Sequence, residues 1–102
     1  MFFLRLFMFS VISASSFGTA AQPPTAADLA FKYHCTTCHG TRGKSSEGRY
    51  PHLAGQNAAY LDARLKYFRS GSEAGNQMNG QAAPLSDEDI QILAEHFAEM
   101  PR

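Results

Sequence analysis

The sequence has little of what builds a large hydrophobic core. It contains no tryptophan, and beyond residues 1–21 only 31 of 81 residues are apolar. A chain of 102 residues has room for one small domain, and small domains bury a low fraction of their surface. Such domains often depend on a disulfide, a metal or a cofactor. We therefore expect a single domain whose centre is not filled by side chains alone.

Neither sign of charge is in excess, because nine Lys and Arg residues balance nine Asp and Glu residues. Proteins that bind nucleic acids usually carry a clear basic excess, so the composition argues against that class. The near-zero net charge also argues against strong electrostatic attraction of a partner protein.

The sequence also lacks an uninterrupted apolar run that would cross a membrane. Spanning takes about 20 apolar residues, whereas residues 1–21 are interrupted by Arg5 and by four serines. The segment has a weakly positive start, an apolar run over residues 6–12 and small residues before Gln22, which is typical of a cleaved export signal. We predict that residues 1–21 are a signal peptide and that residues 22–102 form the mature periplasmic domain. An uncleaved anchor is the alternative.

No alternating strand pattern is present, and apolar residues recur at helical spacing, so we predict an all-α domain. Helices are expected over residues 26–39, 57–69 and from Asp87 to the chain end. The first and the last of them follow a Ser or Thr with Asp three residues later, which is a capping-box pattern. The glycine-rich loops 40–55 and 71–84 are longer than compact helical domains normally use. Together with the apolar deficit, they predict a large buried non-protein group.

Cys35, Cys38 and His39 form a Cys-x-x-Cys-His motif, which is the attachment pattern for c-type haem. On a helical turn these positions share one face, at i, i+3 and i+4. Two thiols there can form thioethers with the vinyl groups of the porphyrin while the imidazole reaches the iron. We predict one covalently attached haem c, with His39 as an iron ligand.

Other functions of the two cysteines remain open at this point. A dithiol redox centre is one alternative, but such motifs usually start a helix after a strand. A zinc site would need four ligands, which His34 and His52 would complete. An incidental disulfide is the third alternative.

The second axial ligand has five candidates, which are Met78, Met100, His34, His52 and His96. Met78 lies in a polar stretch without apolar periodicity, so packing in the core does not explain it. Met100 continues the apolar stripe of the last helix, and His96 is expected at the surface. His34 turns away from the iron when its neighbour is tethered, and His52 is the main rival. We predict Met78, because a thioether opposite an imidazole favours Fe(II) and raises the potential.

Over roughly residues 26–100 the chain resembles the small class I bacterial cytochromes c, of the cytochrome c553 and cytochrome c4-half type. The residues that carry the resemblance are Cys35-Thr36-Thr37-Cys38-His39-Gly40, Pro51-His52-Leu53-Ala54-Gly55-Gln56, Tyr60-Leu61, Leu65, Phe68-Arg69-Ser70-Gly71, Met78, Ala82, Leu85-Ser86-Asp87-Glu88-Asp89-Ile90 and Leu93-Ala94. The resemblance implies a class I cytochrome c fold with three main helices and long loops wrapped around one covalent haem.

The same resemblance assigns roles at the haem. It implies that Cys35 and Cys38 attach the cofactor, that His39 and Met78 are its axial ligands, and that the Pro51 carbonyl accepts a hydrogen bond from the His39 ring. It also implies that the first and last helices cross closely at Phe97. Further expected contacts are the aromatic walls Tyr60, Tyr67 and Phe68 and the propionate partners Arg49, Tyr50 and Gln56.

These features predict a soluble periplasmic monohaem cytochrome that carries one electron between redox protein partners of a respiratory chain. It would dock transiently over a small interface and would not be an enzyme. The alternatives are a dedicated haem c subunit of a periplasmic oxidoreductase complex and, from another class, a haem-based ligand sensor. A dithiol oxidoreductase is a weaker rival.

Overall fold

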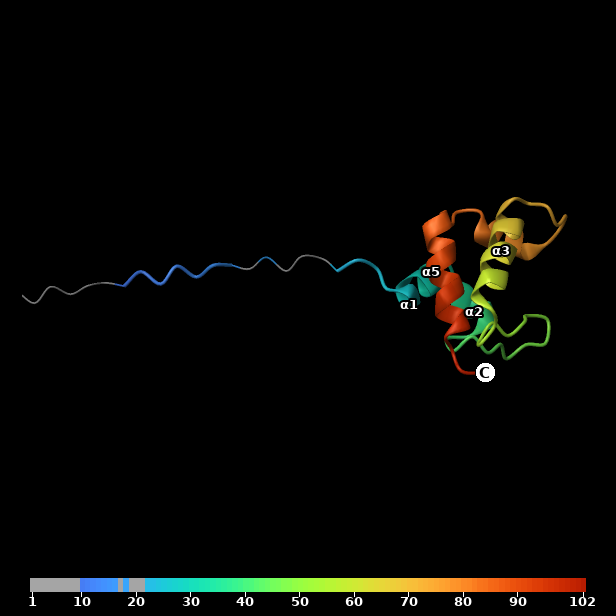
Figure 1. Cartoon of the computed structure of the whole chain (residues 1–102), viewed down its shortest axis with the longest axis horizontal. Coiled ribbons are helices and arrows are strands. Elements are labelled where there is room, and N and C mark those ends of the chain that lie inside the picture. The colour runs from blue at the N-terminus through green and yellow to red at the C-terminus, as the bar shows by residue number, and fades with distance from the viewer. Residues whose placement is uncertain (1–9, 17, 19–21) are drawn as a thin grey trace, which may run out of the picture.

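The computed structural model describes residues 10–16, 18 and 22–102, and within them it contains helices and loops but no strand. The helices are α1 (Ala26–Lys32), α2 (Cys35–His39), α3 (Ala58–Arg69), α4 (Gln77–Ala82) and α5 (Asp87–Ala98). The all-α prediction is confirmed. Residues 10–16 form an irregular segment that extends away from the helices (Figure 1).

Helix α5 is the central element. It packs against both α1 and α3, while α4 packs against α3 and α2 follows α1 (Figure 1). Nine of the ten buried apolar residues of the described chain form one small cluster, which consists of Leu29, Ala30, Leu61, Ala82, Leu85, Ile90, Leu93, Ala94 and Phe97. Three of the nine are alanines, so the core of side chains is thin, as the composition indicates.

The contact between α1 and α5 is close, as expected for the first and last helices. Ala30 of α1 is fully buried and Phe97 of α5 is 2% exposed, and both belong to the buried cluster. The Tyr33 hydroxyl adds a hydrogen bond to Asp89 Oδ2 at 3.3 Å.

The prediction of one helix over residues 26–39 is wrong, because the chain turns at Tyr33 and His34. At the end of α1 the Tyr33 N–H donates to the carbonyl oxygens of Leu29 and Phe31. His34 then adopts a left-handed conformation with φ of 61°. Such a conformation costs about 1–2 kcal/mol for a residue other than glycine, so packing around the motif must impose it. The short helix α2 therefore runs separately from α1.

The prediction of a loop over residues 71–84 is also wrong in part, because α4 lies within it. Asn76 caps this helix, and its side-chain oxygen accepts the Met78 N–H at 2.8 Å. Asparagine is a favoured N-cap, but Gly80 and the polar composition hide the helix from an apolar pattern. Gly71 ends α3 in a left-handed conformation with φ of 71°, as expected for a helix stop.

The loop between α2 and α3 folds back on itself and is tied to α5. The Gly43 carbonyl accepts the N–H groups of Leu53 and Ala54 at 2.8 and 3.0 Å, and the Gly55 N–H donates to Phe97 O at 3.0 Å. Gly43 has φ of 67°, and a Cβ there would lie 2.8 Å from the Ala54 nitrogen. These bonds bring residues 49–53 alongside α2.

Much of the predicted signal peptide, at residues 1–9, 17 and 19–21, lies outside the described residues. Among the residues that are described, no helix is long and apolar enough to cross a membrane.

Candidate functional site

A cavity of about 620 Å³ lies among α2, α3, α4, α5 and the segment before Leu53. Its volume is within the range of cofactor and ligand sites, about 300–1,000 Å³. Much of its wall is apolar and consists of Leu53, Leu61, Leu65, Phe68, Leu85, Leu93, Ala94 and Phe97. Several of these belong to the buried cluster, so the core and the cavity share a wall.

Both cysteines of the motif line this cavity, as half-buried free thiols. Burial raises the pKa of the Cys35 thiol above its usual value. The cysteines of dithiol oxidoreductases have a lowered pKa, so this environment disfavours that alternative. Within the described residues no three His, Cys, Asp or Glu side chains are grouped to hold a metal ion.

His39 is buried, with 6% exposure, and lines the cavity from α2. Its Nδ1 lies 2.9 Å from the Pro51 carbonyl oxygen. A carbonyl only accepts, so Nδ1 carries the proton and donates it. In the neutral ring the other nitrogen, Nε2, then keeps a free lone pair and is available to a metal. The structure thus brings together the His39 and Pro51 that the sequence singled out.

Met78 is half-buried on α4 and lines the same cavity. The cavity therefore carries an imidazole from α2 and a thioether from α4. Met100 packs against the buried cluster instead, and the His96 ring lies edge-on to Phe97 at 5.2 Å. His34 is exposed and is among the residues that line the cavity.

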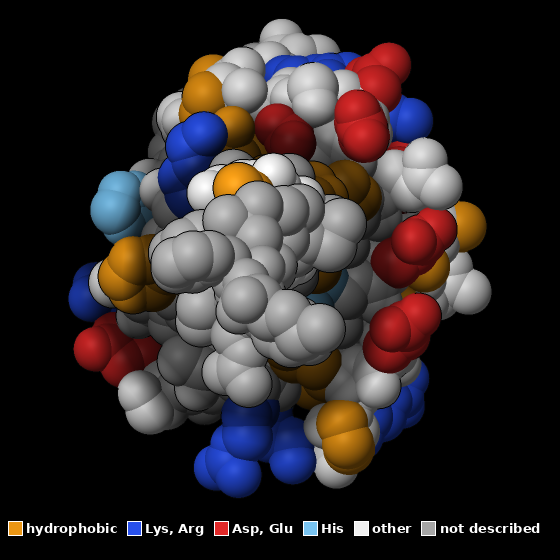
Figure 2. Space-filling model, turned by 90° about the vertical axis from the view of Figure 1, so that its left-hand side faces the viewer, with side chains coloured by type: hydrophobic (Ala, Val, Ile, Leu, Met, Phe, Trp, Pro, Cys, Tyr) orange, Lys and Arg blue, Asp and Glu red, His pale blue; other side chains and the backbone are white. Residues whose placement is uncertain are grey.

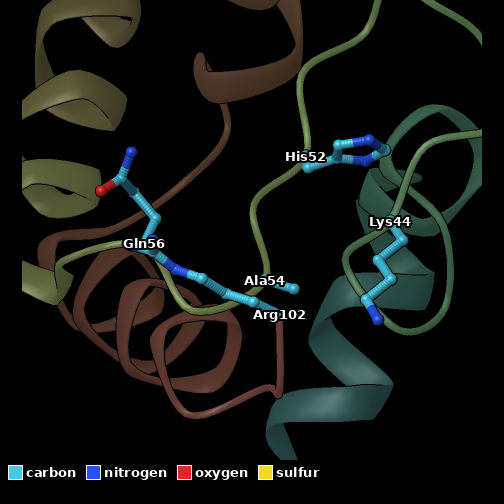
Figure 3. A pocket seen from close by; sticks show the side chains of 5 residues that line it. All are labelled: Lys44, His52, Ala54, Gln56 and Arg102. Atoms are coloured by element: carbon cyan, nitrogen blue, oxygen red, sulfur yellow. The ribbon is translucent and has the colours of Figure 1, made fainter.

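His52 lies in a different place. It lines a second hollow of about 430 Å³ together with Lys44, Ala54, Gln56 and Arg102 (Figure 3). Its Nδ1 accepts the Ser45 N–H at 2.8 Å. The rival axial ligand and one expected propionate partner, Gln56, are thus both outside the cavity that contains the motif.

Of the three aromatic residues expected to form walls of the haem site, one lines the cavity. Phe68 lines the cavity, whereas Tyr60 and Tyr67 do not and are 53% and 37% exposed. Their positions on α3 give helical spacing, but spacing alone does not say which face meets a cofactor. Arg49 and Tyr50 line the cavity as expected.

Sequence reasoning missed Arg64, which lines the cavity from α3. Its guanidinium carbon lies 4.6 Å from the Tyr67 ring centre and 4.7 Å from that of Phe68. The sequence does contain a signal for this contact, because Arg64 precedes the two aromatic residues by three and four positions on a helix, where their side chains are neighbours.

The residues around this cavity fit a covalently bound haem. Two thiols and an imidazole lie on one short helix, a soft thioether lies on another, and the walls between them suit an apolar macrocycle. Arg49 and Arg64 also line the cavity and supply positive charge for the two propionate carboxylates of a haem. No other part of the described chain combines these groups.

Comparison with known proteins identifies the family. A model for cytochrome c matches residues 25–100. The chain belongs to the cytochrome c family. It is 40% identical over 67 residues to cytochrome c-554(548) of Halomonas halodenitrificans, which covers 63% of this chain and 81% of that protein.

Longer cytochromes also match. The thiosulfate dehydrogenase electron acceptor of Thiomonas intermedia is 37% identical over 82 residues, which are 79% of this chain and 35% of that protein. The crystal structure of reduced cytochrome c4 from Pseudomonas stutzeri is 36% identical with a TM-score of 0.61 and covers 66% of this chain and 38% of its own. This cytochrome therefore spans only about a third of these relatives.

Family membership confirms several predictions from the sequence. The resemblance to small class I bacterial cytochromes is confirmed, as is the fold. Haem c is the cofactor, and the function is that of a monohaem electron carrier.

Proposed function

We propose that Cys35 and Cys38 form the two thioethers to haem c and that His39 and Met78 are the axial ligands of its iron. The proposal is supported by the single cavity that all four side chains line. The observation that carries it is the bond between His39 Nδ1 and the Pro51 carbonyl, since it leaves Nε2 free for the iron. When bound, haem c supplies an iron that alternates between Fe(III) and Fe(II).

In this proposal the surrounding residues tune that iron. The Pro51 carbonyl accepts a hydrogen bond from the protonated Nδ1 of His39, which orients the ring and makes Nε2 a better electron-pair donor to the iron. The apolar wall, with Leu93 and Phe97 almost fully buried, keeps water out of the site. Met78 contributes a soft sulfur that favours Fe(II).

We further propose that residues 1–21 direct export and that the mature domain, residues 22–102, works in the periplasm without catalysing a reaction of its own. Redox partners would dock transiently. On the face in Figure 2, side chains of both signs occur around the edge, in keeping with the balanced charge and with weak electrostatic steering.

Absorption spectra of the purified oxidised and reduced protein test the axial ligands. Ferric haem c with a methionine ligand has a weak far-red charge-transfer band, which we expect in the wild type and not in Met78→Ala. Met100→Ala is the matched control and should keep the band. If the reduced wild type binds carbon monoxide rapidly and Met78→Ala leaves the spectrum unchanged, the sixth site is open and the protein is a ligand sensor.

The alternative assembly is a haem subunit of an oxidoreductase complex. Two relatives carry the name of an electron acceptor of thiosulfate dehydrogenase, which favours a dedicated dehydrogenase as partner. Size-exclusion chromatography of native extract distinguishes the two forms. A free carrier elutes as a small protein, whereas a subunit elutes stably with its dehydrogenase.

A further inference from the structure

One backbone carbonyl holds the segment that leads into α4. The Glu73 oxygen accepts a hydrogen bond from Asn79 Nδ2 at 2.6 Å and another from the Asn76 N–H at 3.2 Å. The Asn76 side chain in turn accepts the Met78 N–H at 2.8 Å. Met78 thus lies between two asparagines that both bond to Glu73.

The orientation of the Asn79 amide follows from its bond to Glu73. A carbonyl oxygen only accepts, so Asn79 must present its nitrogen to Glu73. The Asn79 Oδ1 then points into a buried region, where it has no hydrogen-bond partner among the described residues. A buried acceptor without a partner lowers stability and offsets the bond made by the same amide. The net effect of this side chain on global stability is therefore small.

We propose that Asn79 is a positioning residue for Met78. It fixes the first turn of α4 and so controls how readily another ligand displaces the Met78 thioether from the iron. Asn79 does not itself line the cavity, whereas Asn76, Gln77 and Met78 do, so it acts through the backbone. The inference rests on the proposed function, because it assumes that Met78 binds the iron.

Glu73 also makes an ion pair through its side chain, so the contribution of its carbonyl to the position of α4 must be separated from that of its carboxylate. Its carboxylate lies 3.5 Å from Arg64 Nη2, with the two side chains 44% and 39% exposed. An exposed pair of this kind contributes little. The hydrogen bond to the Glu73 carbonyl, and not the ion pair of its side chain, is therefore the contact that positions α4.

The test compares ferric holoproteins titrated with imidazole, which competes for the sixth site, while the far-red methionine band is followed. Asn79→Ala should bind imidazole about fivefold more tightly than the wild type, the factor that corresponds to one lost hydrogen bond. Its midpoint in urea should change little. Asn79→Leu keeps the branched shape of the side chain, with a somewhat larger volume and no hydrogen-bonding group, and should behave in the same way.

Two controls should stay within about twofold of the wild type, a factor smaller than one hydrogen bond. Glu73→Gln removes the ion pair but keeps the carbonyl. Ala83→Ser changes an exposed residue at the end of α4 that does not line the cavity. If both Asn79 variants bind imidazole like Ala83→Ser, the inference is wrong. If the wild type lacks the methionine band, the assignment of Met78 fails instead.

Discussion

Leu93 and Ile90 lie on the same helix and are equally buried, but they face different surroundings. Leu93 is 1% exposed and lines the cavity, whereas Ile90 is fully buried and does not line it. Replacing each by alanine separates an effect on the fold from an effect on the cofactor. Both substitutions remove methyl and methylene groups from the same buried cluster.

The loss of stability should be similar for the two variants. A buried Leu or Ile replaced by Ala costs about 2–5 kcal/mol, because contacts are lost and a void is left. In a domain of this size each kcal/mol lowers Tm by about 4–8 °C. A loss of about 3 kcal/mol therefore lowers Tm by roughly 12–24 °C. Thermal unfolding followed by circular dichroism measures this loss.

The reduction potential should distinguish the variants. Only Leu93→Ala opens the apolar wall, and water admitted there favours the more highly charged Fe(III) form, which lowers the potential. Spectroelectrochemical titration of both holoproteins measures it. We expect a lower potential for Leu93→Ala and a potential close to wild type for Ile90→Ala. Equal shifts in both variants, or none in either, would refute the role given to the wall.

Two further predictions concern the fold. Gly43→Ala should lower the free energy of unfolding by at least about 1–2 kcal/mol, because φ is 67° and the new Cβ would meet the Ala54 backbone. Gly48→Ala is the control, since a Cβ there meets nothing within 4 Å. Equal urea midpoints for the two variants would contradict the argument. The hydrogen bond from Arg69 at 2.6 Å holds the pKa of Asp87 below its usual value. Its stabilisation is thus present above the unfolded pKa of about 4 and lost as pH falls through the folded pKa. The urea midpoint of Arg69→Gln should trail that of the wild type by more at pH 6 than at pH 2; an equal gap at both would contradict this reasoning.

Local chemistry explains which features could be predicted from the sequence. The Cys-x-x-Cys-His motif is readable because its spacing places three groups on one turn. The capping boxes that begin α1 and α5 are both present, since each depends on residues three apart. Met78 was predicted as an iron ligand by elimination, although the helix that carries it was not predicted.

Features that depend on the tertiary environment could not be predicted. The break at His34 needs a conformation that only its surroundings impose. An apolar or aromatic stripe says which face is buried, but not whether protein, cofactor or solvent covers it. Tyr67 and Phe68 are adjacent on α3, yet only Phe68 lines the cavity. Arg64 lines the cavity and stacks on the rings of Tyr67 and Phe68. A pattern of apolar residues does not indicate such a contact of a charged side chain.

The thin core and the large cavity have one explanation. Leu61, Leu85, Leu93 and Phe97 belong both to the buried cluster and to the cavity wall, so each packs against other helices on one side and faces the cavity on the other. Haem c supplies the apolar surface that this chain lacks, and without it the wall would face water. A cofactor that dissociated would leave that wall exposed each time it left. Covalent attachment therefore stabilises the fold as well as retaining the iron for electron transfer.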